Sequence, residues 1–143
     1  AAIDDPTLEL SPGTTVFYDA GYTFAFPDLL FQIAAVLLTR VISRPSPDRL
    51  TLDLGYKACA SDPPAGRRLV FPDLPDAEQV LQNEEHLVLK TPQADRFQPG
   101  DELIAIPRHI CPTTALHKQV YVVSGGQLVG RWDVAARDRC LTI

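Results

Sequence analysis

The stretch "IAAVLLTRVISRPSPDRLTLDLG" (residues 33–55) places two apolar segments on either side of a cluster of turn-forming residues. Residues 49–55 alternate strictly between apolar and polar side chains, which is the pattern of a strand with one buried face. The segment 33–44 is long enough to form a bent strand, and the prolines, serine and aspartate of 45–48 end it. We therefore predict that residues 33–54 form a β-hairpin.

Short apolar runs separated by proline, glycine, aspartate and serine continue along the chain, at intervals typical of all-β domains. The clearest further hairpin is 119–134, where Gly125 and Gly126 suit a two-residue turn that requires positive φ angles. Single strands are predicted at 14–20, 67–71, 86–90 and 102–109. Helix is limited to a turn or two near 27–32 and 113–118.

These elements predict an all-β fold that is mainly antiparallel, closed or nearly closed into a β-barrel, with little helix. Residues 1–12 are acidic, contain proline and lack a sustained period, so we interpret them as a linker or arriving segment. Residues 13–143 then form a single domain. Because the first residue is alanine rather than methionine, we expect the chain to have been cut from a longer protein.

The composition excludes several classes of function. The 143 residues, 45% apolar and 22% charged, are typical of one globular domain. A net charge of −5 supports neither nucleic acid nor an anionic membrane as a partner. The most apolar stretch, 29–38, is too short to cross a bilayer. Motifs of the α/β-hydrolase, Walker and dinucleotide-binding types are absent from the sequence.

The three cysteines, Cys59, Cys111 and Cys140, are odd in number and far apart, so they predict no disulfide framework. Because the sequence has no secretory signal at its start, we expect a reducing, cytoplasmic location.

The segment "IPRHICPT" (106–113) places His109 two positions from Cys111, between two prolines. If the strand at 102–109 continued to Cys111, both side chains would leave one face with roughly 6.6 Å between their Cα atoms. One zinc ion could then bridge the imidazole and the thiolate. Since the sequence offers no further ligand pair, such a metal would keep open positions, as catalytic metals do. A histidine and a cysteine that merely fill the core remain the alternative.

Five stretches occur in the order seen in one family. They are "PGTTVFYDAGY" (12–22), "VISRPSPDRLTLDLGYKACASD" (41–62), "NEEHLVL" (83–89), "PRHICPT" (107–113) and "VYVVSGGQLVGRWDVAARDR" (120–139). They resemble the C-terminal domain of D-threonine aldolases and of metal-dependent D-serine dehydratases of the eukaryotic type. The resemblance covers nearly the whole chain from residue 12.

The resemblance implies a two-domain, homodimeric enzyme of pyridoxal-phosphate fold type III. An N-terminal (β/α)8 barrel would carry pyridoxal phosphate on a lysine, and a C-terminal β-barrel like that of alanine racemase would supply divalent-metal ligands, matched here by His109 and Cys111. Aldolases often have aspartate as the second ligand. The cysteine of this chain is closer to the dehydratase pattern and favours zinc over manganese, because thiolate is the softer ligand.

The resemblance also limits what the chain can do by itself. None of Lys57, Lys90 and Lys118 matches the cofactor lysine of the family, so no catalytic or pyridoxal-phosphate-binding residue is expected here. We therefore predict the metal-binding part of a lyase for small D-3-hydroxy amino acids, inactive when alone. The alternative is a stand-alone β-domain that binds a ligand or dimerises without catalysis.

Overall fold

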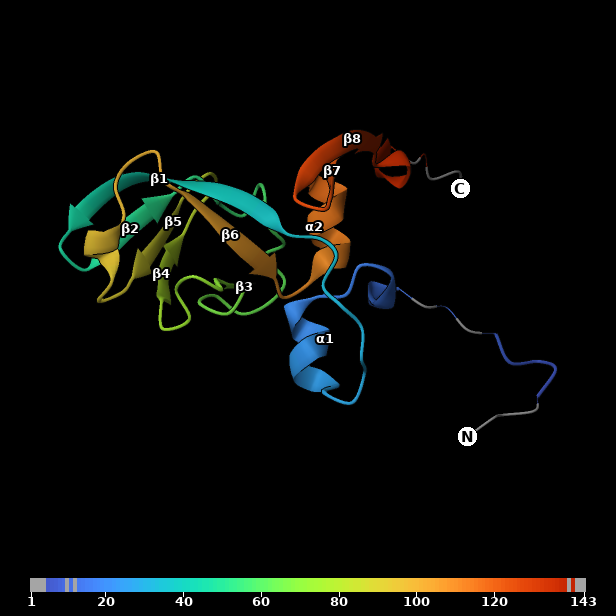
Figure 1. The fold of residues 1–143 in the computed structure, drawn as a ribbon. Helices are drawn as coiled ribbons and strands as arrows, with labels where there is room; N and C mark the ends of the chain where they lie inside the picture. Colours follow the sequence, from blue (N-terminus) through green and yellow to red (C-terminus); the bar gives the residue numbers. More distant parts are fainter. Residues whose placement is uncertain (1–4, 10, 12, 139, 141–143) are drawn as a thin grey trace.

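The structure is a computed structural model that describes residues 5–9, 11, 13–138 and 140 (Figure 1). Its strands are β1 (Leu37–Ser46), β2 (Arg49–Leu52), β3 (Leu69–Val70), β4 (Glu78–Gln82), β5 (Leu87–Lys90), β6 (Glu102–Pro107), β7 (Gln119–Ser124) and β8 (Gln127–Asp133). Its helices are α1 (Ala20–Ala25), α2 (Ile110–Leu116) and the short 3-10 helices η1 (Thr14–Val16), η2 (Ala94–Arg96) and η3 (Ala135–Asp138).

Strands β1 to β6 form one curled antiparallel sheet in the order β3-β6-β1-β2-β5-β4, and β7 and β8 form a separate two-stranded sheet (Figure 1). This arrangement confirms the prediction of a mainly antiparallel all-β domain that curls as a barrel does, with little helix. The hairpin predicted at 33–54 is the β1–β2 pair, although its first strand begins at Leu37. In the β7–β8 turn, Gly125 and Gly126 have φ angles of 56° and 76°, as the sequence predicts.

A side chain joins the two edges of the curled sheet. The Gln79 Nε2 of β4 donates to the carbonyl oxygen of Leu69 in β3 at 2.8 Å, and its Oε1 accepts from the backbone N–H of Arg68 at 3.3 Å. One amide group therefore makes the pair of hydrogen bonds that a neighbouring strand would otherwise provide. The sheet is closed by a side chain at this seam, which protects edges that would otherwise be free to pair with another chain.

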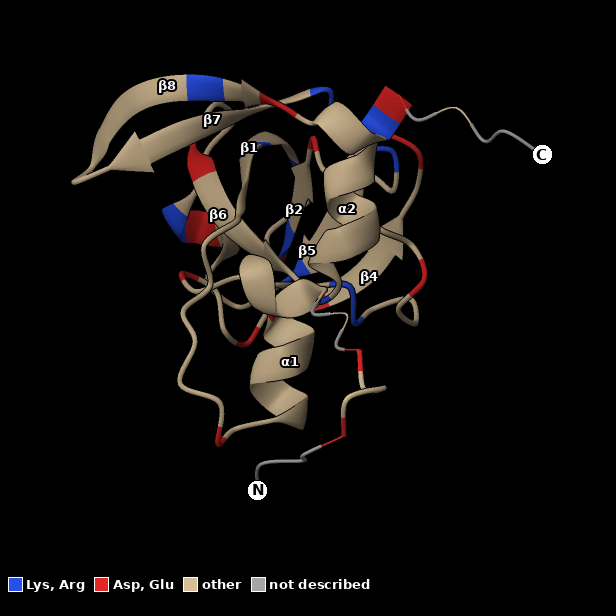
Figure 2. Cartoon of the chain, turned by 90° about the vertical axis from the view of Figure 1, so that its right-hand side faces the viewer, with Lys and Arg blue, Asp and Glu red and all other residues tan. Residues whose placement is uncertain are grey.

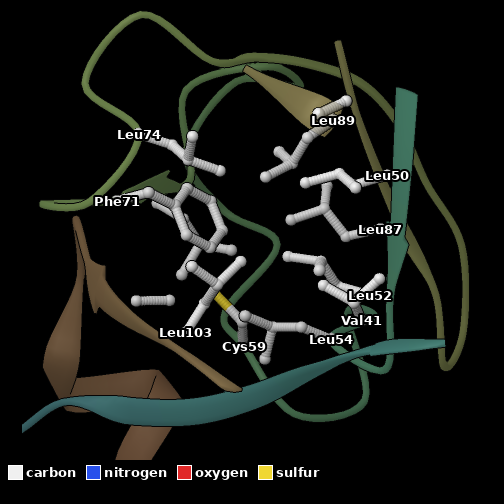
Figure 3. Packing of buried hydrophobic residues seen from close by; sticks show 13 residues of the cluster. Val41, Leu50, Leu52, Leu54, Cys59, Phe71, Leu74, Leu87, Leu89 and Leu103 are labelled. Carbon is white, nitrogen blue, oxygen red and sulfur yellow. The ribbon is translucent and has the colours of Figure 1, made fainter. Parts of the chain in front are cut away.

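The core lies inside the curl of the sheet, where leucines from several strands meet (Figure 3). Leu50 and Leu52 of β2 are fully buried and lie opposite Leu89 and Leu87 of β5. Because alternate residues of a strand point to the same face, the alternation at 49–55 correctly predicts which side chains are buried. The strands predicted at 67–71 and 86–90 are β3 and β5.

The prediction of a strand at 14–20 is wrong. This segment forms η1 and the first residue of α1, although its β-branched and aromatic residues favour a strand. Tyr18 adopts a φ of 55°, in the left-handed region, which interrupts any extended conformation. The Asp19 side chain then accepts a hydrogen bond from the backbone N–H of Tyr22 at 2.9 Å and caps α1.

Two further differences from the sequence predictions are found along the chain. Residues 27–32 contain no helix, and α2 lies close to the turn expected at 113–118 but begins at Ile110. Strand β4 is missed because it is an edge strand without a buried alternating face, and both Val80 and Leu81 are exposed. Hydrophobic periodicity carries no signal for such a strand.

The ends of the chain are only partly described. Residues 5–9 and 11 contain turns but no helix or strand, whereas residues 1–4, 10 and 12 of the predicted linker lie outside the described residues, as do 139 and 141–143 of the predicted domain. Of the helices that the structure describes, none is long and apolar enough to span a membrane.

We predict that Gly55→Ala destabilises the fold. A Cβ at this position would lie 2.0 Å from the carbonyl oxygen of Glu84, so the backbone after β4 would have to move. Overpacking of this kind costs about 1–3 kcal/mol in the free energy of unfolding, which urea denaturation measures. Gly130→Ala is the matched control, because a Cβ at Gly130 has no neighbour within 4 Å. Equal stability of the two variants would contradict the prediction.

Candidate metal centre

The backbone from 107 to 111 turns from strand to helix. The prediction of an extended segment that continues to Cys111 is wrong, because β6 ends at Pro107 and α2 begins at Ile110. His109 is the N-cap residue of α2, with φ −142° and ψ 98°, and Cys111 is the second residue of the helix. The two candidate ligands are therefore presented by a strand-to-helix turn and not by one face of a strand.

The turn forms here because a buried carboxylate satisfies the first helical N–H groups. Asp19 is only 1% exposed, and its Oδ2 accepts a hydrogen bond from the backbone N–H of Ile110 at 2.9 Å. Its Oδ1 accepts from Tyr22 in α1, so one carboxylate caps both helices. The first N–H groups of a helix have no partner within the helix, and a carboxylate there is also favoured by the helix dipole.

Helix α1 packs tightly against the same turn. A Cβ at Gly21 would lie 2.3 Å from the carbonyl oxygen of Arg108, so only glycine fits between the two backbones. The Arg108 guanidinium lies 4.4 Å from the centre of the Phe24 ring, a cation–π contact that joins the turn after β6 to α1. The backbone on both sides of His109 is therefore held by the N-terminal part of the chain.

The imidazole of His109 is held by an acidic side chain from a distant loop. Its Nδ1 is hydrogen-bonded to Oδ2 of Asp62, and both side chains are about half exposed. Because a carboxylate can only accept, Nδ1 carries the proton, and in the neutral form of the ring Nε2 keeps its lone pair. Histidines that bind metals commonly have this arrangement. Asp62 lies 47 positions from His109, and no local pattern in the sequence identifies it.

The sulfur of Cys111 has a partner from a third segment. Its Sγ lies 3.2 Å from the hydroxyl oxygen of Thr14 in η1, which is buried. When the thiol is deprotonated, this hydroxyl can donate a hydrogen bond to the thiolate. Cys111 itself is exposed, so the sulfur can be reached from outside.

The loop that carries Asp62 is fixed to α2 by Thr113 and His117. The buried Thr113 hydroxyl accepts from the backbone N–H of Ala60 at 3.1 Å and donates to the carbonyl oxygen of His109 at 2.7 Å. His117 Nε2 lies 2.9 Å from the carbonyl oxygen of Ala58. His117 is therefore a half-buried residue with a structural role.

Two other reactive groups, Cys59 and Lys57, are engaged elsewhere in the fold. Cys59 lies in the core, and burial raises the pKa of its thiol to about 11, so this thiol is protonated at neutral pH. Lys57 contacts Glu85 at 2.7 Å and Glu84 at 3.0 Å, and these carboxylates raise its pKa above the ordinary lysine value. A lysine held charged in this way is a poor nucleophile.

By their donor chemistry, His109 and Cys111 suit an open zinc site rather than a complete one. Across the part of the chain that the structure describes, no three histidine, cysteine, aspartate or glutamate residues are grouped so that they could hold a metal ion. His109 Nε2 and Cys111 Sγ would therefore be two ligands, and an imidazole with a thiolate suits zinc. The other positions would be left to water, substrate or residues from elsewhere.

Comparison with known proteins identifies related sequences. Residues 34–123 match the family described as "Putative serine dehydratase domain". A D-threonine aldolase from Arthrobacter sp is 34% identical over 134 residues, which are 90% of this chain and 34% of that protein. An uncharacterized protein of Mycobacterium tuberculosis (strain ATCC 25618 / H37Rv) is 36% identical over 117 residues, which are 78% of this chain and 86% of that protein.

Solved structures show the same fold. The D-threonine aldolase from Filomicrobium marinum superposes with a TM-score of 0.78 at 28% identity, over 88% of this chain and 34% of that one. A D-threo-3-hydroxyaspartate dehydratase variant in the metal-free form superposes with a TM-score of 0.66 at 20% identity, over 85% of this chain and 37% of that one. The chain thus spans about a third of these enzymes but most of the mycobacterial protein.

We predict that Asp19→Ala destabilises the protein, because it removes the caps of two helices. Each cap is worth about 1 kcal/mol, so we expect a loss of roughly 2 kcal/mol in the free energy of unfolding, measured by urea denaturation. Asp19→Asn, which keeps one carbonyl oxygen, should lose about half of that. The control is Asp73→Ala at an exposed aspartate. A loss no larger than that of the control would count against the double cap.

Proposed function

The chain belongs to the serine dehydratase domain family, and on this premise we propose that it is the metal-binding C-terminal domain of a pyridoxal-phosphate-dependent lyase for D-3-hydroxy amino acids. The observation that carries the proposal is the turn at 109–111, which offers an imidazole oriented by Asp62 and an exposed thiol. The likeness to D-threonine aldolases supports the class of substrate, with aldol cleavage or dehydration as the reaction.

The two side chains would divide the work of holding the metal. His109 would bind through Nε2 and Cys111 through its thiolate, and this pair favours zinc over manganese. When bound, the metal supplies a Lewis acid for the 3-hydroxyl group of the substrate. Asp62 keeps the imidazole in place, and Thr14 stabilises the thiolate by donating its hydroxyl hydrogen.

The rest of the active site would come from an N-terminal (β/α)8 barrel in the full-length, homodimeric and cytoplasmic protein. That domain would hold pyridoxal phosphate, which supplies the electron sink for chemistry at the α-carbon. The side of the domain with α1, α2 and the β7–β8 hairpin suits such a contact, because Figure 2 shows no charged residue on α1 or α2 and few on the hairpin. Large apolar side chains are exposed there, including Phe24, Tyr121 and Trp132.

A second candidate function is supported by the mycobacterial relative, most of whose length is aligned with this chain. Proteins of about this size therefore occur in the family. A stand-alone β-domain could use the exposed apolar face to bind a partner or a second copy, with no catalysis. Tyr121, Val123, Leu128 and Trp132 of the hairpin are each more than 60% exposed.

We expect the purified chain to retain about one zinc ion after dialysis, as measured by elemental analysis, because two oriented ligands are present. His109→Ala and Cys111→Ala should each lose most of it. His86→Ala and Cys140→Ala are matched controls at exposed positions and should keep the wild-type content. Undiminished zinc in both site variants would overturn the metal-binding proposal.

We also expect the isolated chain to be inactive on D-threonine and D-serine when pyridoxal phosphate and zinc are added. The reason is that none of Lys57, Lys90 and Lys118 matches the cofactor lysine of the family, and Lys57 is paired with two glutamates. Product formation by the isolated chain, measured by release of glycine or ammonia, would contradict this. Analytical ultracentrifugation of the same sample tests the alternative of a stand-alone β-domain. If the wild-type chain is a dimer and Trp132→Ser is a monomer, the result favours a stand-alone dimerisation domain.

A further inference from the structure

We propose that Asp62 is a positioning residue for the metal ligand His109, and that it makes Nε2 the nitrogen that binds the metal. This inference rests on the proposed function, since it concerns the same site. It starts from the hydrogen bond between His109 Nδ1 and the Asp62 carboxylate, which joins two segments 47 positions apart.

The carboxylate selects one of the two neutral forms of the imidazole. A neutral imidazole carries its proton on either Nδ1 or Nε2, and the free ring interconverts between the two. An acceptor at Nδ1 keeps the proton there, so the lone pair needed for metal binding stays on Nε2. No hydrogen bond to Nε2 is found among residues 5–9, 11, 13–138 and 140, so this nitrogen is available to a metal.

Asp62 can act in this way because its loop is fixed to the same helix that follows His109. The Thr113 hydroxyl accepts from the Ala60 N–H and donates to the His109 carbonyl oxygen. One hydroxyl therefore links the loop to the backbone of the histidine. Cys59, next in the loop, is 1% exposed and packed in the core. These anchors compensate for the partial exposure of the imidazole and the carboxylate, where water competes for each polar group.

Zinc affinity of the whole chain tests the inference, measured by competition with a chromophoric chelator. Loss of a carboxylate behind a metal-binding histidine lowers metal affinity about 10–100-fold, and we expect Asp62→Ala to fall in this range. Asp62→Asn should be intermediate, because its amide oxygen still accepts from Nδ1–H without the charge. Asp76→Ala removes the same charge at an exposed position and should bind zinc as the wild type does.

A second measurement reports the orientation of the proton directly. In the metal-free protein, ring nitrogen NMR should find the proton of His109 on Nδ1 in the wild type and a mixture of both forms in Asp62→Ala. A residue that only stabilised the loop would leave this ratio unchanged. Thermal unfolding checks that the variants fold, and if Asp62→Ala does not fold, Asp62→Asn gives the result through its affinity and its ring proton.

The outcomes separate the inference from the proposed function. If His109→Ala weakens zinc binding but Asp62→Ala and Asp62→Asn match Asp76→Ala, the role of Asp62 is overturned and the metal site stands. If His109→Ala binds zinc as tightly as the wild type, the metal site itself is overturned. Weakened binding in both His109→Ala and Asp62→Ala, with the altered ring proton, supports both proposals.

Discussion

The buried carboxylate of Asp19 is the interaction on which the arrangement of the candidate site depends. A charge that is 1% exposed is tolerated only with partners, and here it accepts one N–H from each of two helices. By capping α2 at Ile110, just after β6 ends at Pro107, it helps to set the positions of His109 and Cys111. The N-terminal segment is therefore a structural part of the domain from η1 onward.

The sequence predicts the sheet better than it predicts the site. Strands such as β2 and β5 bury every second residue, and this periodicity is visible in the amino acids themselves. The edge strand β4 lacks such a signal because most of its residues are exposed on both faces. The helix α1 lacks it because a side-chain cap, from Asp19, starts this helix. The residue types of His109 and Cys111 suggest a candidate metal site, but they do not predict the turn that presents them.

The partners of the two candidate ligands could not be predicted, because each belongs to a remote segment. Thr14 reaches Cys111 from η1, and Asp62 reaches His109 from a loop between β2 and β3. Their residue types are common, and only the folded chain brings them near the turn. The closure of the sheet could not be predicted for the same reason. It depends on the side chain of Gln79, which makes hydrogen bonds that a neighbouring strand would otherwise make.

The contacts around the turn span 97, 91 and 47 positions of the chain for Thr14, Asp19 and Asp62. Closing such long loops costs conformational entropy. Only the contacts of the complete fold offset this cost, so a partly folded chain does not hold the three loops closed. An ion that binds only when all three loops are closed would shift the equilibrium between the folded and unfolded chain by mass action. It would therefore raise the stability of the complete fold and not that of a fragment. Occupancy of the turn would thus couple the N-terminal segment, the Asp62 loop and α2 into one cooperative unit.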